Sequence, residues 1–482
     1  MKLKNSALFR EQGYIDGKWC DADSGETFPV TNPATGEVIG SVPLMGAKET
    51  TRAIEAANMA WGPWRALTAK ARHGILMKWF HLMLDNAEDL AIIMTTEQGK
   101  PLAEAKGEIA YAASFIEWFA EEGKRAYGDI IPGHMTDKRI LVMKQPIGVV
   151  ASITPWNFPS AMLTRKAGPA LAAGCPFVAK PAGETPYSAL ALAYLAGEAG
   201  MPAGLFNVLT GKSSIIGKTM TDSNIIRKLT FTGSTEVGRI LMKQCAENIT
   251  KVGLELGGNA PFIVFDDADI DAAVEGAIIC KYRNTGQTCV CANRIYVQDS
   301  VYDEFLEKFV AKVKQLKVGN GLDEGTTQGP LISMSAVEKV EEHIADALSK
   351  GGRLMTGGKR HELGHSFFEP TVIADATKEM KASCEETFGP VAPVFKFKTE
   401  EEVLERANNT EFGLAAYFYA RDVGRIFRVS EGLESGIVGV NTGIISTEVA
   451  PFGGIKQSGI GREGSKYGLE DFMEIKYVCL GI

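Results

Sequence analysis

Cys289 is the residue of this chain best placed to act as a nucleophile. It lies in the segment Asn284–Arg294 (NTGQTCVCANR). The preceding residues, 269–283, carry apolar side chains at helical spacing, and 294–297 (RIYV) read as a strand. A thiol on a loop between rigid elements can be both held and approached, and its thiolate is the reactive form. The alternative is a buried structural cysteine, which behaves as a small core hydrophobe.

Glu255 supplies a candidate general base. It ends an apolar, strand-like run and precedes two glycines in the sequence ELGG. A carboxylate in that position is expected to be partly desolvated, which raises its pKa toward the range of a general base. The alternative is a glutamate at the edge of the core that pairs with a lysine or an arginine.

Asn157 offers a neutral hydrogen-bond donor. It precedes Pro159 in PWNFP, at the expected start of a helix. Two interpretations remain open at this stage. The side chain caps the helix, or its amide donates to an oxyanion.

From Gly148 onward, strand-like runs alternate with helical segments, as in a parallel doubly wound sheet. Such sheets bind ligands beyond the carboxyl ends of their strands. The residues expected at or just past these ends are Asn157, Lys180, Gly211, Ser234 and Glu255. Glycines in GSTEVG (233–238), between a strand and a helix, let the backbone approach a phosphate. The sequence therefore predicts a nucleotide site in an α/β protein.

The remaining segments complete the expected architecture. Residues 12–43 suggest a small β-meander, and residues 48–120 read as helices. Residues 131–148 suggest a protruding hairpin, with which the β-rich C-terminal YVCLGI pairs unless it pairs with another subunit. A second α/β region is expected from Ala260 to about Gly459.

Composition and charge exclude several classes of function. The net charge of −8 argues against nucleic-acid and anionic-membrane partners, and no apolar run is long enough to span a membrane. Eight scattered cysteines do not resemble a disulfide framework, so the cytoplasm is the expected compartment. The sequence HELGH (361–365) fits a zinc pattern, but its glycines favour a loop, and no metal site is expected.

Taken together, the motifs FTGS (231–234), ELGG, GQTC, PWNFP, EETFGP (385–390) and PFGGIKQSGIGREG (451–464) resemble the aldehyde dehydrogenase superfamily in order and spacing. The resemblance covers essentially the whole chain. It implies a Rossmann-type cofactor domain (1–125 and 146–257), an α/β catalytic domain (258–459) and a small β oligomerisation flap (126–145 and 460–482). It also implies a homo-oligomer, a dimer of dimers.

The resemblance implies a mechanism as well. Cys289 attacks an aldehyde, Asn157 and the Cys289 N–H hold the oxyanion, and hydride passes to a nicotinamide. Water activated by Glu255 then hydrolyses the thioester. The residues implied to contact the cofactor are Trp156, Lys180, Gly183, Gly233, Ser234, Leu256, Glu386 and Phe388.

Within the superfamily, TRKAGPA, KYRN and CVC resemble the succinate-semialdehyde dehydrogenase branch. Arg165, Arg283 and Ser446 then correspond to positions that hold the substrate carboxylate. Alternatively, the arginines form ordinary ion pairs and the substrate is another aldehyde, such as glutarate semialdehyde. A cysteine acyl-hydrolase and a catalytically silent scaffold are the rival classes.

Two further expectations concern the cofactor and redox control. Many NAD-using relatives carry a glutamate where KPAGE places Gly183. Its absence predicts NADP, paired with Lys180, with NAD as the alternative. Cys291, two residues from Cys289, is expected either to form a reversible disulfide with it or to be a packed small residue.

Overall fold

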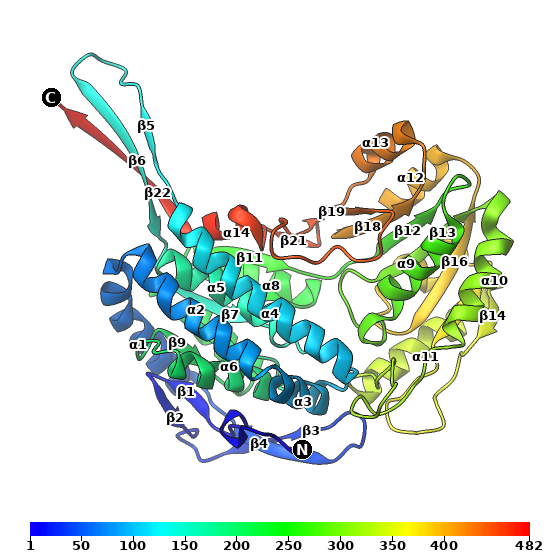
Figure 1. Cartoon of the computed structure of the whole chain (residues 1–482), viewed down its shortest axis with the longest axis horizontal. Coiled ribbons are helices and arrows are strands. Elements are labelled where there is room, and N and C mark those ends of the chain that lie inside the picture. Colours follow the sequence, from blue (N-terminus) through cyan, green and yellow to red (C-terminus); the bar gives the residue numbers. More distant parts are fainter.

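The computed structural model describes residues 1–482, and its first unit is built on an eight-stranded sheet with the order β2-β1-β9-β8-β7-β10-β11-β21 (Figure 1). The five central strands are parallel: β7 (Val149–Ile153), β8 (Phe177–Lys180), β9 (Phe206–Val208), β10 (Ile226–Thr232) and β11 (Lys251–Glu255). Their order reverses between β7 and β10, which creates a switch point where α/β sheets bind ligands.

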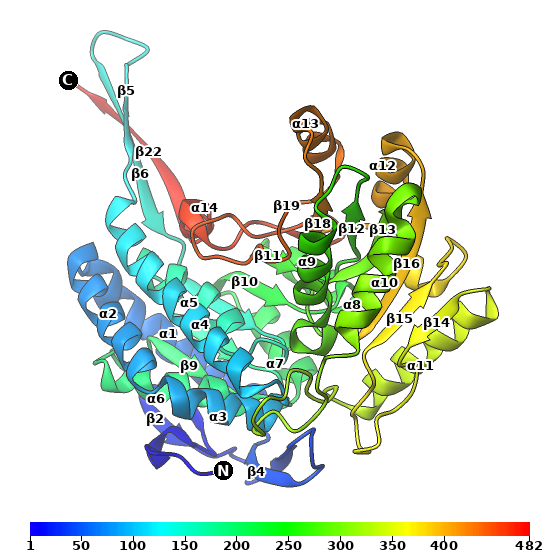
Figure 2. The same cartoon turned by 45° about the vertical axis from the view of Figure 1, so that its right-hand side comes forward.

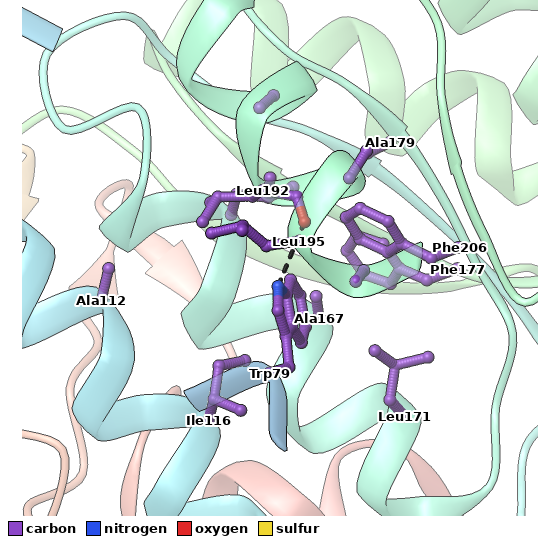
Figure 3. Packing of buried hydrophobic residues seen from close by; sticks show 14 of the residues in the cluster. Trp79, Ala112, Ile116, Ala167, Leu171, Phe177, Ala179, Leu192, Leu195 and Phe206 are labelled. Atoms are coloured by element: carbon purple, nitrogen blue, oxygen red, sulfur yellow. Dashed lines mark hydrogen bonds between the residues drawn. The ribbon is translucent and has the colours of Figure 1, made fainter. Parts of the chain in front are cut away.

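Helices cover both faces of this sheet. They are α1 (Ala47–Ala66), α2 (Ala69–Asp85), α3 (Ala87–Gln98), α4 (Leu102–Glu122), α5 (Ala161–Ala173), α6 (Pro186–Glu198), α7 (Ser213–Asp222) and α8 (Thr235–Ala246). Residues of α2 to α6 share one apolar core, and residues of α1, α7 and α8 share another on the opposite face. Trp79 of α2 lies deep in the first core, where its indole N–H donates to the Leu192 carbonyl at 3.1 Å (Figure 3).

A seven-stranded sheet with the order β14-β15-β16-β13-β12-β18-β19 forms the second unit (Figure 2). Its strands are β12 (Ala260–Val264), β13 (Ala292–Gln298), β14 (Arg353–Thr356), β15 (Thr371–Ala374), β16 (Val391–Phe397), β18 (Ala415–Tyr419) and β19 (Ile437–Val440). The helices α9 (Ile270–Tyr282) and α10 (Tyr302–Val313) pack on one face. The helices α11 (Met334–Ser349), α12 (Glu400–Asn408) and α13 (Val423–Gly432) pack on the other. The α/β class predicted from the sequence is confirmed.

A three-stranded flap projects from the first unit, at the upper left of both views (Figures 1 and 2). It contains β5 (Asp129–Ile131), β6 (Lys138–Pro146) and β22 (Met473–Gly481), and β22 pairs along the whole of β6. The expected pairing of the C-terminus with the hairpin is confirmed.

The N-terminal meander prediction was wrong. The strands β1 (Gly13–Ile15) and β2 (Lys18–Cys20) form a hairpin at the edge of the first sheet, where Tyr14 pairs with Val208. The strands β3 (Thr27–Thr31) and β4 (Val38–Pro43) form a separate hairpin. β1 joins the open edge of β9 because its side chains are buried there.

The chain returns to the first unit near its end. The short strand β21 (Gly459–Ile460) pairs with β11, and α14 (Ser465–Glu470) contacts α4 and α5. The division into a cofactor domain (1–125, 146–257), a catalytic domain (258–459) and a flap (126–145, 460–482) stays a prediction. None of the helices has the length and apolar character that crossing a membrane requires.

Candidate active site

A cavity of about 230 Å³ lies at the switch point. It is lined by Pro155, Trp156, Asn157, Phe158, Met162, Thr232, Gly233, Ser234, Leu256, Gly257, Cys289, Glu386 and Phe388. Eight of the residues predicted from the sequence therefore surround one space. Seven do not line it: Glu255, Lys180, Gly183, Arg165, Arg283, Ser446 and Cys291.

The loop that carries Cys289 is tightly fixed. Asp269 caps the start of α9 by accepting from the Ala272 N–H at 3.1 Å, and β13 begins soon after the thiol. Between these elements, Asn284 and Thr285 have left-handed φ values of 51° and 57°. Gly286 follows with φ 75°, and a Cβ there would lie 2.2 Å from the Gly389 carbonyl oxygen. These contacts hold the thiol against the cavity.

The surroundings of Cys289 favour the neutral thiol. Burial raises its pKa to about 12, and the nearby carboxylate of Glu386 acts in the same direction. The guanidinium of Arg165 opposes them. Because only a thiolate is a strong nucleophile, the site needs a group that accepts the thiol proton.

Asn157 points its amide toward the Cys289 loop. Its Nδ2 donates to the Gln287 carbonyl at 3.0 Å, and its Oδ1 accepts from the Phe158 N–H at 3.1 Å. That is the only hydrogen bond of Nδ2, so one amide N–H remains available beside the cavity. The helix α5 starts at Ala161 after Ser160 as N-cap. The helix-cap interpretation of Asn157 was therefore wrong, because three residues separate it from α5.

Glu255 ends β11 and is 4% exposed. Burial raises its pKa well above the ordinary value, and the negative charge of Glu463 adds to the effect. Its Oε2 has no hydrogen-bond partner. The other oxygen approaches Gly453, where a Cβ would lie 3.0 Å away. The buried carboxylate predicted from the sequence is thus present at the end of β11.

Two charged residues near Glu255 were missed by the sequence analysis. Glu463 contacts the ammonium of Lys166 and lies 2.6 Å from Arg165 Nε. Lys166 also donates to the Thr232 hydroxyl at 2.6 Å, and its burial lowers its pKa. The available signal was weak: a lysine next to Arg165 in a largely apolar helix, and a glutamate within the glycine-rich run 451–464.

Several features suit a dinucleotide. Gly233 must be glycine, because a Cβ would lie 2.4 Å from the Phe231 ring. Ser234 caps α8 by accepting from Val237, so free N–H groups of a helix start point outward. Trp156 meets Phe388 edge-on, with ring centroids 5.6 Å apart. These residues fit an anionic, aromatic ligand.

Lys180 and Glu386 are the ionisable side chains assigned to this region. Lys180 ends β8, has no carboxylate within 4.0 Å, and its burial lowers its pKa to about 8. The carboxylate of Glu386 accepts from the Gly258 N–H at 3.2 Å, and burial raises its pKa to about 8. At Gly183 a Cβ would make only an ordinary 3.6 Å contact with Phe28, so space alone does not require glycine.

The two candidate arginines have different surroundings. Arg165 is fully buried, pairs with Glu463 and lies 4.0 Å from the centroid of the Phe452 ring. Arg283 is half-buried, forms no ion pair and lies 5.2 Å from the centroid of the Phe158 ring. Arg283 is therefore a cation with free donors beside a residue that lines the cavity.

Two further side chains border this area. Ser446 is half-buried in the segment that leads to Phe452, the residue against Arg165. Tyr111 of α4 was missed by the sequence analysis. Its hydroxyl is buried without a partner, and its ring meets Phe115 at 4.8 Å.

Cys291 is buried on another side of the loop. Its Sγ lies 3.5 Å from Lys281 Nζ and 3.4 Å from the Gly286 carbonyl oxygen. Both Cys289 and Cys291 are free thiols. The disulfide between them stays a prediction, since it requires Cys291 to leave these contacts. The HELGH segment at 361–365 forms turns, as the sequence predicted.

The profile of the aldehyde dehydrogenase family matches residues 19–478, and the chain belongs to that family. It is 68% identical over 481 residues to the glutarate-semialdehyde dehydrogenase of Pseudomonas aeruginosa. It is 67% identical over 482 residues to GabD of Escherichia coli, a succinate-semialdehyde dehydrogenase [NADP(+)]. Both alignments cover 100% of each chain. The crystal structure of an E. coli NADP-dependent enzyme superposes with a TM-score of 0.99 over 100% of both chains, at 67% identity.

Proposed function

We propose that this enzyme oxidises succinate semialdehyde to succinate with NADP. The observation that carries the proposal is the single cavity in which a thiol, a free amide N–H and dinucleotide-binding features meet. The name of the E. coli relative supports the substrate and the cofactor. Glutarate semialdehyde, one methylene longer, is the second candidate because the P. aeruginosa relative bears that name.

In the proposed reaction the Cys289 sulfur bonds to the aldehyde carbon while the thiol proton passes to a base. Asn157 Nδ2 and the Cys289 N–H donate to the resulting oxyanion. When bound in the cavity, NADP would supply the hydride acceptor for oxidation of this adduct to a thioester. Glu255 then takes a proton from the attacking water, and the sulfur leaves as succinate forms.

Glu255 is suited to this work because burial raises its pKa well above the ordinary value, which makes its carboxylate a stronger proton acceptor. In the structure its side chain faces Gly453 and not the cavity, so the proposal requires a rotation about its side-chain bonds. The buried pair of Lys166 and Glu463 lies beside it and offers a route for the proton away from the site.

The cofactor-binding assignment supports a dehydrogenase over a cysteine acyl-hydrolase, which needs no nucleotide. Glu386, Ser234 and the aromatic pair of Trp156 and Phe388 share the cavity with Cys289. Lys180 is proposed to pair with the 2′-phosphate of NADP, since it lacks any carboxylate partner and Gly183 adds no negative charge.

We propose that Arg283 binds the substrate carboxylate and that Arg165 and Ser446 complete the site for this anion. Arg283 carries the larger part of this assignment because its donors are free.

We also propose that the enzyme is a cytoplasmic homo-oligomer, a dimer of dimers. Eight free thiols suit a reducing compartment, and the exposed apolar residues of the flap suit subunit contacts.

The test measures NADPH and NADH formation at 340 nm with succinate semialdehyde, glutarate semialdehyde and butanal. We expect the highest kcat/KM for succinate semialdehyde with NADP, and no turnover in Cys289→Ala. The dehydrogenase assignment is contradicted if the enzyme hydrolyses a thioester but forms no NADPH or NADH from any of these aldehydes. A kcat/KM for butanal equal to that for succinate semialdehyde contradicts the substrate assignment alone.

A further inference from the structure

The connection between α3 and α4 lies directly behind Asn157. It contains Lys100, which is 1% exposed. Its ammonium donates to Glu108 Oε2 at 2.5 Å and to the Asn157 carbonyl oxygen at 2.7 Å. The same ammonium lies 4.0 Å from the centroid of the Phe158 ring. A buried ammonium is costly unless its donors are satisfied, so these partners fix its position.

Glu108 links the same lysine to the start of α5. Its second oxygen, Oε1, accepts from the N–H groups of Ser160 and Ala161 at 3.0 and 3.2 Å. The side chain of Ser160, the N-cap residue, makes no capping bond of its own. Glu108 therefore does the capping, and it joins the first turn of α5 to Lys100.

The backbone at Asn157 transmits this position to the side-chain amide. Its carbonyl accepts from Lys100 and, at 3.1 Å, from Asn284 Nδ2. The same peptide unit contributes the Phe158 N–H, which donates to Asn157 Oδ1 at 3.1 Å. With Oδ1 held in this way, Nδ2 must face Gln287 and the cavity. Fixing the peptide thus fixes the amide.

Gln98 closes the network onto the Cys289 loop. Its Nε2 donates to Asn284 Oδ1 at 3.0 Å, and its Oε1 accepts from the Lys100 N–H at 2.9 Å. Gln98, Lys100, Asn157 and Asn284 are all at most 5% exposed. The network therefore connects the α3–α4 junction to both the amide donor and the loop that carries the nucleophile.

We propose that Lys100, paired with Glu108, is a positioning residue that holds the Asn157 amide at the oxyanion. This inference rests on the proposed function, in which Asn157 donates to the adduct. Lys100 touches neither the cavity nor the reacting atoms, so its removal should lower kcat and leave KM and cofactor affinity nearly unchanged. A small displacement of the Asn157 amide is enough to lower kcat, because the amide stabilises the transition state only from the position where the negative charge develops.

A double-mutant cycle tests the inference. Lys100→Met is made in the wild-type chain and in Asn157→Ala, and kcat is measured per folded site. We expect a loss of about 10–100-fold in the wild-type background and of less than about 2-fold in Asn157→Ala. With an aldehyde deuterated at C1, the primary isotope effect on kcat should rise in Lys100→Met. Equal losses in both backgrounds overturn the inference.

Glu97→Gln is the matched control. Glu97 also lies near the end of α3 and is fully buried, but it accepts from the N–H groups of Tyr187 and Ser188, both at 2.8 Å, at the start of α6. We expect a lower Tm and an unchanged kcat. A kcat loss in Glu97→Gln equal to that in Lys100→Met would show that general destabilisation explains both, and would overturn the inference.

Glu108→Gln replaces Lys100→Met in the cycle if that variant does not fold. It keeps an oxygen for the α5 N–H groups but removes the charge beside Lys100, and we expect the same dependence on Asn157. The failures are distinguishable. An unchanged kcat in Asn157→Ala overturns the proposed role of Asn157 and this inference with it. A reduced kcat in Asn157→Ala with multiplicative losses overturns only the role of Lys100.

Discussion

Arg283 and Arg165 carry the same charge, but they differ in whether a carboxylate of the protein already pairs with it. Arg165 pairs with Glu463, which it shares with Lys166, whereas Arg283 has no carboxylate within 4.0 Å. A remote substrate carboxylate that meets Arg283 gains a charge-assisted hydrogen bond of about 1.5–3 kcal/mol. Because the contact is the same before and in the transition state, its loss should appear mainly in KM.

Arg283→Met should therefore lower kcat/KM for succinate semialdehyde by about one to two orders of magnitude and leave butanal nearly unaffected. Arg165→Met is the comparison. It should impair both aldehydes, because it also leaves Glu463 short of a partner beside Glu255. Steady-state kinetics of both variants with both aldehydes gives the answer. Equal losses for the two aldehydes in Arg283→Met exclude it as the carboxylate-binding residue.

Lys180 should make NADP use dependent on pH. Its pKa is lowered to about 8 by burial, and only its protonated form pairs with the 2′-phosphate. As pH rises through 8, the free enzyme loses this charge, so kcat/KM for NADP should fall more steeply than that for NAD. The decline belongs to the free enzyme, because a bound phosphate stabilises the ammonium.

Pre-steady-state and steady-state rates between pH 6.5 and 9.5 with both cofactors, measured in wild type and Lys180→Met, check this expectation. The variant should lose about 10–100-fold in kcat/KM for NADP at pH 7 and show no separate decline above pH 8. Identical pH profiles for NADP and NAD in the wild type speak against the phosphate contact.

At the scale of single residues, the sequence predicted those functional residues whose side-chain chemistry and neighbouring motif point to the same role. Glu255 ends a recognisable strand, and Cys289 and Asn157 lie on loops between recognisable helices and strands. The sequence analysis did not identify Lys166 and Glu463, because their contact joins positions 297 residues apart. Neither residue lies in a local pattern that indicates a charge pair. Asn157 was open to two interpretations because only the structure shows that α5 begins beyond it.

Among the elements, the loop between α9 and β13 determines where the nucleophile stands. Its backbone takes left-handed values at three successive residues, 284–286, and Gly286 packs directly against the Gly389 carbonyl. Gly286→Ala should destabilise the protein by about 2–4 kcal/mol, because it adds a clash to the strain of its φ. It should also remove most activity by displacing Cys289.

Gly200→Ala is the control, since Gly200 has a similar φ of 84° but nothing within 4 Å of an added Cβ. It should cost only about 1 kcal/mol and leave kcat unchanged. Urea unfolding and kcat for both variants separate strain from clash. Similar losses in the two variants contradict the tight-loop interpretation.

The helices and parallel strands of the first sheet were predictable because their periodicity is local. The edge strand β1 was not, because its partner β9 lies about two hundred residues later and the pairing rests on a single bridge between Tyr14 and Val208. Local turn signals in residues 12–43 mark where the chain reverses, but they carry no information about which sheet each pair of strands joins, so the meander prediction was wrong.

At the scale of the whole molecule, the flap is the segment whose exposed apolar side chains find no packing partner within a single subunit. It projects from the first unit (Figures 1 and 2). It exposes Ile130, Ile475, Tyr477 and Leu480 at 83%, 73%, 59% and 51%. An apolar sheet exposed on this scale is typical of a contact surface. The sequence predicted the flap and its pairing, but the contact of one copy with another remains a proposal.

We expect the wild-type protein to have a solution mass that is a multiple of the 51.9 kDa chain, measured by light scattering after gel filtration. The double variant Ile130→Glu, Ile475→Glu should lower that multiple, because carboxylates on both outer strands resist burial in an interface. Its Tm should fall with it, since assembly stabilises the folded subunit. Met59→Glu, at a residue 78% exposed on α1, controls for added charge and should change neither quantity. A wild-type mass of one chain, or an unchanged mass in the flap variant, removes the flap from the subunit interface.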